Sequence, residues 1–141
     1  MPKYWLFKED PGTYSYDDLV RDKKTIWSGV HNNLALIHLR NVKSGDEIFF
    51  YQTGEDKTIV GVMKSLGDAY SLDRTKSKAS QSKEVAVDVA PLKKLERPVS
   101  LSEIKGDSRF TDFPLVKISR LSVMPVTPEQ WNLILKLASS K

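Results

Sequence analysis

Side chains suited to binding a nucleic acid base gather in segment 27–32, which has the sequence WSGVHN. Base recognition needs an aromatic wall that stacks on the base, a few polar groups for its edge, and cations for the phosphates. Here Trp27 offers an indole, Ser28 a hydroxyl and Asn32 an amide, and we expect them at a loop-to-helix junction with unpaired backbone N–H groups. A lone tryptophan more often fills the core, so composition leaves both roles for Trp27 open.

The sequence carries no motif of the common nucleotide-binding or metal-dependent enzymes. It lacks a P-loop, a G-x-G-x-x-G fingerprint and an H-E-x-x-H pair. His31 and His38 have no acidic or second-histidine set at ligand spacing. The absence of cysteine removes thiolate nucleophiles, disulfides and Cys-ligated zinc. We therefore expect no catalytic residue, no metal and no cofactor.

Lysine and arginine outnumber aspartate and glutamate by 22 to 18, for a formal net charge of +4. This balance favours an anionic partner without naming one. Part of the positive charge falls in segment 71–83, where Asp73 is the only acid and the cations are Arg74, Lys76, Lys78 and Lys83. We expect a mobile basic loop, which either contacts phosphate groups or is simply a solvated surface.

The length of 141 residues suits one domain with one core. No apolar run approaches the roughly 20 residues that cross a bilayer, and the N-terminal residues lack the apolar stretch of a signal peptide. We expect a cytoplasmic chain with no membrane partner. A monomer is the default expectation, and no sequence feature fixes the oligomeric state.

The pattern of apolar residues and caps predicts short strands interrupted by short helices. Strands are predicted over residues 4–7, 46–52, 59–63, 85–89 and 121–126, and Gly61 indicates a bulge or a close backbone approach. Ser15 with Asp18, and Ser100 with Glu103, resemble capping boxes. Further helices are predicted at 34–40, capped by Asn32 or Asn33 with Leu34, Ile37 and Leu39 partly on one face, and after Thr127.

These elements show no βαβ alternation, internal repeat or domain linker. We expect an α+β fold built on a small, mostly antiparallel β-barrel of about five or six strands with short flanking helices. Residues 1–141 should form a single domain. Periodicity does not give the strand order.

Several segments, taken in order along the chain, resemble EVE domains. They are Tyr4-Trp5-Leu6-Phe7-Lys8, Trp27-Ser28-Gly29-Val30 with Asn32, Gly45-Asp46 with Phe49-Phe50-Tyr51, Ile59-Val60-Gly61-Val62 leading to Ala69-Tyr70, Val87-Asp88-Val89, Arg97-Pro98-Val99-Ser100-Leu101, and Arg120 to Trp131. The resemblance covers nearly the whole chain. It implies the PUA-like fold shared with YTH and ASCH domains, and the binding of a modified DNA or RNA base.

The resemblance also implies a site. Trp27 would be the stacking wall of a base pocket, Ser28 a polar contact, and Lys8, Asn32 and Tyr70 residues that line or close it. EVE sequences often have aspartate and arginine where this chain has Ser28 and His31, which leaves the preferred base open. The turn after Lys8 also departs from the common pattern, so the resemblance assigns no contact to Glu9.

Two further residues are candidates for the same site. Tyr51 alternates with two phenylalanines on a strand, and its hydroxyl requires a partner if buried. Arg120 precedes the last strand and either contacts a phosphate or forms a structural ion pair; His31, Arg74, Lys76 and Lys78 are the other candidates for nucleic acid contacts.

We expect a non-catalytic reader that captures a flipped or single-stranded modified base, of the methylated or hydroxymethylated cytosine or methyladenine type. A small ASCH-type ribonuclease or hydrolase using Lys8, Asp10 and Tyr51 is an alternative. A protein-interaction module that docks an acidic partner through the basic loop is another.

Overall fold

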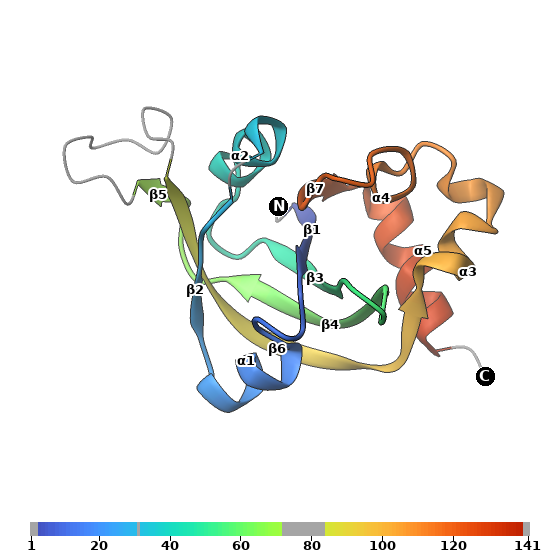
Figure 1. The fold of residues 1–141 in the computed structure, drawn as a ribbon, viewed down its shortest axis with the longest axis horizontal. Coiled ribbons are helices and arrows are strands. Elements are labelled where there is room, and N and C mark those ends of the chain that lie inside the picture. The colour runs from blue at the N-terminus through green and yellow to red at the C-terminus, as the bar shows by residue number, and fades with distance from the viewer. Residues whose placement is uncertain (1–2, 31, 72–83, 140–141) are drawn as a thin grey trace.

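The computed structural model describes residues 3–30, 32–71 and 84–139. Figure 1 shows a strongly curled sheet with helices at its ends and sides. The strands are β1 (Tyr4–Glu9), β2 (Thr25–Trp27), β3 (Glu47–Gln52), β4 (Thr58–Ser65), β5 (Tyr70–Ser71), β6 (Val85–Ser100) and β7 (Val123–Val126). The helices are α1 (Tyr16–Asp22), α2 (Asn33–Arg40), α3 (Leu101–Lys105), α4 (Pro114–Lys117) and α5 (Pro128–Ser139), with a 3₁₀ turn η2 (Ser108–Phe110).

The sheet has the strand order β2-β6-β4-β3-β1-β7, and β5 pairs with β6. Only β1 and β3 run parallel; the other pairings are antiparallel. Trp27 of β2 lies 5.3 Å from Phe7 of β1 between ring centroids, although three strands separate them in the order. The sheet therefore curls on itself into a half-barrel, which confirms the predicted α+β, mostly antiparallel fold.

Gly61 allows the sheet to close around a buried tyrosine. A Cβ at position 61 would lie 2.5 Å from the ring of Tyr16. The Tyr16 hydroxyl donates to the Val62 carbonyl at 2.8 Å, and burial raises the pKa of Tyr16 to about 12. The β4–β6 register also shifts between Ile59 and Gly61. Both parts of the prediction for Gly61, a bulge and a close approach, are confirmed.

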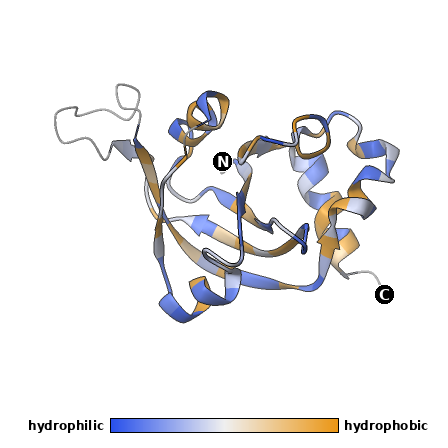
Figure 2. Cartoon of the chain, in the orientation of Figure 1, coloured by the Kyte–Doolittle hydropathy of each residue, from blue (hydrophilic) through white to orange (hydrophobic). Residues whose placement is uncertain are grey.

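The predicted helix caps form as expected. Ser15 and Ser100 each accept from the backbone of the third helical residue, whose carboxylate accepts in return from the cap. Thr127 Oγ1 accepts from Gln130 N at 3.1 Å, so α5 begins at Pro128. Asn32, rather than Asn33, caps α2, with its Oδ1 accepting from Ala35 N at 3.0 Å. Figure 2 shows mixed hydrophilic and hydrophobic stretches along α1 and α2, as expected for helices that cover a sheet.

Two predictions about local structure were wrong. Leu34, Ile37 and Leu39 do not share one face: Leu34 and Ile37 are 40% and 50% exposed, whereas α2 turns Leu39 inward with Ala35 and Leu36. Trp27 does not sit at a loop-to-helix junction. It ends β2, and α2 begins only at residue 33. The predicted strand 85–89 is also much longer, because β6 continues through Pro91 and Pro98 to Ser100.

Candidate base-binding site

Trp27 lines a small pocket between the end of β1, the loop before α1, and β2. Its indole packs against Phe7 at 5.3 Å and edge-on against Phe50 at 5.3 Å between centroids. Only 5% of the residue is exposed, so most of the ring fills the core and the remainder borders the pocket. Trp27 is therefore a core residue with one edge at the pocket.

The pocket has a volume of about 210 Å³. This is below the roughly 300–1,000 Å³ of sites for drug-sized ligands, and it suits a group as small as one base. Its lining residues are Glu9, Thr13, Tyr14, Thr25, Ile26, Trp27 and Ser28. Aromatic, apolar and polar groups thus meet around one hollow, which is the combination that base recognition requires.

Ser28 follows Trp27 at the mouth of this pocket and is exposed. Gly29 comes next with a φ of +78°, a left-handed conformation that favours glycine. This turn carries the chain away from the sheet directly after the two pocket residues. The Trp-Ser-Gly sequence therefore ends β2 at Trp27 and leaves Ser28 exposed beside the pocket.

Glu9 brings a carboxylate to the same pocket from the end of β1. The side chain is half-buried, and its Oε1 accepts from Asp10 N at 2.9 Å. Burial raises the pKa of the Glu9 carboxyl, more than the hydrogen bond from Asp10 lowers it. Glu9 is thus the carboxylate that lines the hollow, and it comes from a different strand than Trp27.

Tyr14 is the second aromatic residue of the pocket. Its hydroxyl donates to Asp22 Oδ2 at 2.8 Å, which holds the side chain between β1 and α1. Burial, and then the bond to Asp22, raise the pKa of Tyr14. No signal in the sequence pointed to Tyr14, because it lies in a loop with no neighbouring motif; its contact with the pocket depends on the fold.

Lys8 and Tyr51 are not in this pocket. Successive strand residues point to opposite faces of a sheet, and Phe7 and Glu9 already point toward Trp27. Lys8 instead faces the outer side, where its Nζ donates to the Ser119 carbonyl at 2.8 Å and lies 5.6 Å from the centroid of the Tyr51 ring. The structure therefore separates Lys8 and Tyr51 from Trp27, contrary to the expectation of one shared pocket.

Asn32 and Tyr70 are not among the residues that line the Trp27 pocket. Asn32 caps α2. Tyr70 on β5 donates its hydroxyl to Asp88 Oδ1 at 2.7 Å, and burial, then this hydrogen bond, raise its pKa to about 12. Asp88 borders an adjoining hollow of about 430 Å³ with Lys24, Thr25 and Ile26, the last two of which also line the Trp27 pocket.

The remaining candidates for phosphate contacts are placed as follows. Arg120 is exposed in the turn before β7, next to Ser119 and on the Lys8 side of the sheet. His31, Arg74, Lys76 and Lys78 lie outside the described residues.

The hydrolase alternative required Asp10 beside Lys8 and Tyr51. Asp10 Oδ1 instead accepts from Gly12 N at 2.7 Å, and Asp10 does not line the pocket that Lys8 and Tyr51 share.

No group of three or more histidine, aspartate or glutamate side chains suited to a metal ion occurs among residues 3–30, 32–71 and 84–139. Over the same ranges, no helix is both long and apolar enough to cross a membrane.

Comparison with known proteins gives a consistent result along the chain. Residues 3–137 match the family model described as EVE domain. Thymocyte nuclear protein 1 from Rattus norvegicus is 33% identical over 172 residues, covering 100% of this chain and 76% of the relative. An NMR structure of a Rhodopseudomonas palustris protein is 38% identical with a TM-score of 0.86, covering 96% of this chain and 92% of that one. The crystal structure of human THYN1 in complex with DNA containing 5-methylcytosine is 28% identical with a TM-score of 0.87, covering 99% of each chain.

Proposed function

Because the chain belongs to the EVE domain family, we propose that it is a non-catalytic reader of nucleic acid that holds one modified base in the Trp27 pocket. The observation that carries this proposal is the meeting of Trp27, Tyr14 and Glu9 around a hollow the size of a base. The similarity to human THYN1, whose crystal structure is a complex with 5-methylcytosine DNA, supports a cytosine-type base.

The pocket offers a contact for each part of 5-methylcytosine. A carboxylate accepts from the exocyclic N4 amine of cytosine, and Glu9 is the acidic residue that lines the hollow. The exposed edge of the Trp27 indole provides apolar surface for the ring and its methyl group. Ser28 and Thr25 add hydroxyls for the remaining polar edge. A flipped or single-stranded base would enter at the exposed Ser28 end.

The test compares single-stranded DNA of about ten nucleotides containing one 5-methylcytosine with the same strand unmodified, and with matched RNA, by fluorescence polarisation. Trp27→Ala is a poor probe, because removing a buried tryptophan costs about 3–5 kcal/mol of stability. Trp27→Phe retains a ring against Phe7 and Phe50. We expect it to weaken binding of the methylated strand by about tenfold, since stacking on one base contributes roughly 1–3 kcal/mol.

Trp131→Phe is the matched control. Trp131 is also buried, but it stacks between Tyr4 and Phe49 on the other face of the sheet. This variant should lose stability without losing preference for the methylated strand. Equal binding of both strands by the parent protein would overturn the proposal, as would a Trp27→Phe protein that retains the full preference.

The cytoplasmic location stays a prediction. The name of the vertebrate relatives describes them as nuclear proteins. A chain that binds nucleic acid requires access to it, and imaging of the tagged protein would locate it.

A further inference from the structure

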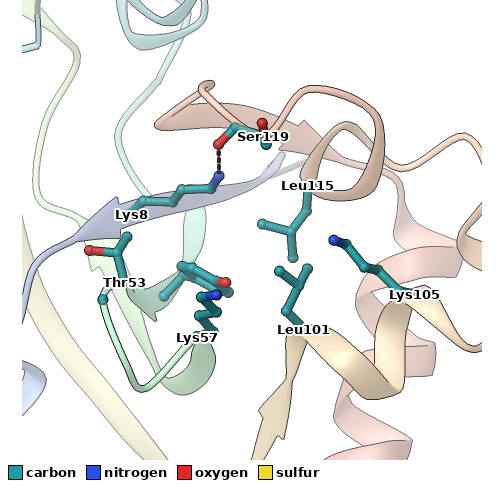
Figure 3. Close-up of a pocket in the computed structure, with 9 residues that line it drawn as sticks. Lys8, Thr53, Lys57, Leu101, Lys105, Leu115 and Ser119 are labelled. Atoms are coloured by element: carbon teal, nitrogen blue, oxygen red, sulfur yellow. Dashed lines mark hydrogen bonds between the residues drawn. The ribbon is translucent and has the colours of Figure 1, made fainter.

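A second hollow lies on the outer face of the sheet, opposite the Trp27 pocket. It has a volume of about 280 Å³. Its lining residues are Lys8, Tyr51, Thr53, Gly54, Lys57, Leu101, Lys105, Leu115 and Ser119. Figure 3 shows that they come from β1, the β3–β4 turn, α3 and the segment around α4, so the fold assembles this pocket from distant parts of the chain.

The charged residues that line this lysine pocket are all cations. Lys8, Lys57 and Lys105 border it, and no carboxylate does. Elsewhere in the described residues, Lys94 pairs with Asp17 and Lys117 with Asp112. Within the same part of the chain no ion pair joins Lys57 or Lys105 to an acid.

The acids of the adjoining turn do not neutralise the lysine pocket. Asp56 Oδ2 accepts from Gln52 Nε2 at 2.8 Å, and Glu55 is exposed and not among the lining residues. The three ammonium groups that border the hollow therefore have no counter-charge among its lining residues. An anion in the hollow would supply one.

Tyr51 adds a hydrogen-bond donor to the hollow. The residue is 3% exposed and lines the hollow. Burial raises the pKa of its phenol. No hydrogen bond joins the hydroxyl to another of the described residues, among which no fully buried side-chain oxygen or nitrogen is left without a partner. The hydroxyl therefore reaches the hollow, where it can donate to an acceptor.

We propose that the lysine pocket binds a phosphate group. Phosphate oxygens accept charge-assisted hydrogen bonds from lysine ammonium groups, and ordinary ones from the hydroxyls of Tyr51 and Thr53. Leu101 and Leu115 form an apolar wall, which excludes water and strengthens the attraction between opposite charges. Neither the Trp27 pocket nor base recognition is needed for this proposal.

The lysine pocket and the Trp27 pocket lie on opposite faces of the sheet at the same end of β1. Lys8 lines one, and Glu9, the next residue, lines the other. If the proposed function holds, a strand with its base against Trp27 that continues around this end of β1 would bring a neighbouring phosphate to the lysine pocket. The phosphate group would then belong to the nucleic acid backbone rather than to a free or terminal phosphate.

The first arm of the test titrates inorganic phosphate into the folded protein and follows backbone amide signals by NMR. We expect shifts at Thr53, Gly54 and Lys57. Lys57→Asn with Lys105→Gln should weaken this binding at least tenfold; asparagine is chosen because Lys57 has a φ of +47°. Tyr51→Phe should weaken it several-fold without lowering the melting temperature. Lys64→Gln, an exposed lysine on β4, is the matched control and should change nothing.

The second arm measures the salt dependence of binding to the single-stranded DNA. A backbone phosphate predicts that the double variant lowers the slope of log K against log salt by up to about 0.7 for each phosphate that the lysines no longer neutralise. If inorganic phosphate shifts the amide signals but the double variant leaves the slope of log K against log salt unchanged, the pocket would be assigned to a free or terminal phosphate. Trp27→Phe should leave the amide shifts caused by phosphate unchanged. A failure of the base-binding proposal can therefore be told apart from a failure of the phosphate proposal. Absence of both effects in the double variant would overturn the inference.

Discussion

Glu9 is the residue whose position most changes the expected specificity of the site. Its carboxylate lines the pocket with Trp27, where it can accept from a cytosine amine. Glu9→Gln replaces this charged acceptor with a neutral amide. We expect binding of the methylated strand to weaken by about 1.5–3 kcal/mol, the range for hydrogen bonds to charged groups. Isothermal titration calorimetry would measure the difference, and unchanged affinity would exclude Glu9 as the acceptor.

The same substitution should also change the pH dependence of stability. Burial raises the pKa of Glu9, so the folded chain holds this proton more tightly than the unfolded chain. The contribution of Glu9 to the stability of the fold is therefore fully present below the pKa of the unfolded state, and it is lost as the pH rises through the pKa of the folded state. Glu9→Gln should be more stable than the parent at pH 7, by less than about 1 kcal/mol because the group is half exposed. Urea unfolding of both proteins at pH 4 and pH 7 measures this difference in stability. A variant that is more stable than the parent only at pH 4 would contradict the prediction.

Gly61 tests the packing of Tyr16 inside the half-barrel. Gly61→Ala places a methyl group 2.5 Å from the Tyr16 ring, and overpacking of this kind costs typically about 1–3 kcal/mol. Gly67→Ala is the matched control, because nothing lies within 4 Å of its added Cβ. Equal urea midpoints for the two variants would show that the sheet can move away from Tyr16.

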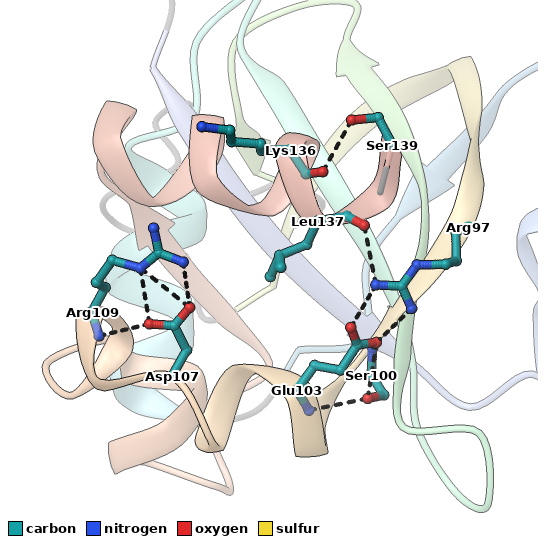
Figure 4. Close-up of polar contacts among 8 residues, drawn as sticks. All are labelled: Arg97, Ser100, Glu103, Asp107, Arg109, Lys136, Leu137 and Ser139. Carbon is teal, nitrogen blue, oxygen red and sulfur yellow. Dashed lines mark hydrogen bonds and ion pairs between the residues drawn. The ribbon is translucent and has the colours of Figure 1, made fainter. Parts of the chain in front are cut away.

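Among the elements, Arg97 joins two consecutive ones, β6 and α3, to α5, which lies further along the chain. It lies on β6, pairs with Glu103 of α3 at 2.6 Å and donates to the Leu137 carbonyl of α5 at 3.1 Å (Figure 4). Arg97→Met should loosen the end of α5 and lower the free energy of unfolding only modestly, since both charged groups are partly exposed. Hydrogen exchange should become faster at 135–139 and stay unchanged in α1. Uniform acceleration along the chain would instead indicate a global loss of stability.

The sequence predicted the elements that carry strong local signals. Ser15, Ser100 and Thr127 are caps whose partners lie three residues away, so their geometry is local and the helices begin where expected. β2 has three residues and no alternation, and β6 runs through Pro91 and Pro98, which usually end a strand. Their pairing is set by contacts between distant residues, which periodicity does not contain.

The same limit explains what was predicted of the site. Trp27 and Ser28 were correctly placed together, because adjacent residues stay adjacent in any fold. Tyr14 and Glu9 reach them only through the curl of the sheet. Lys8 and Tyr51 share the outer face because β1 and β3 pair in parallel, with Lys8 opposite Tyr51, a register that no short motif specifies.

For the molecule as a whole, the proposed sites divide recognition into a stacking part at Trp27 and a cationic part at the lysine pocket. That residues 1–141 act as a single domain and as a monomer stays a prediction. If the base is read by Trp27 and the phosphates by lysines, salt should weaken binding to methylated and unmodified strands alike. Their affinity ratio should therefore stay within about twofold between about 50 and 200 mM salt, measured by polarisation. A ratio that collapses with salt would mean that charge, rather than the pocket, reads the modification.

The position of Trp27 in the complex is the most direct measure of base capture. The chain has three tryptophans: Trp5 donates its Nε1 to Asp46 at 2.8 Å, and Trp131 is stacked in the core, so their indole NMR signals serve as internal references. On addition of single-stranded DNA with one 5-methylcytosine, we expect the Trp27 indole signal to shift to saturation while the other two stay nearly still. The unmodified strand should shift it less at equal concentration. A saturated complex in which the Trp27 signal has not moved would contradict the proposed base pocket.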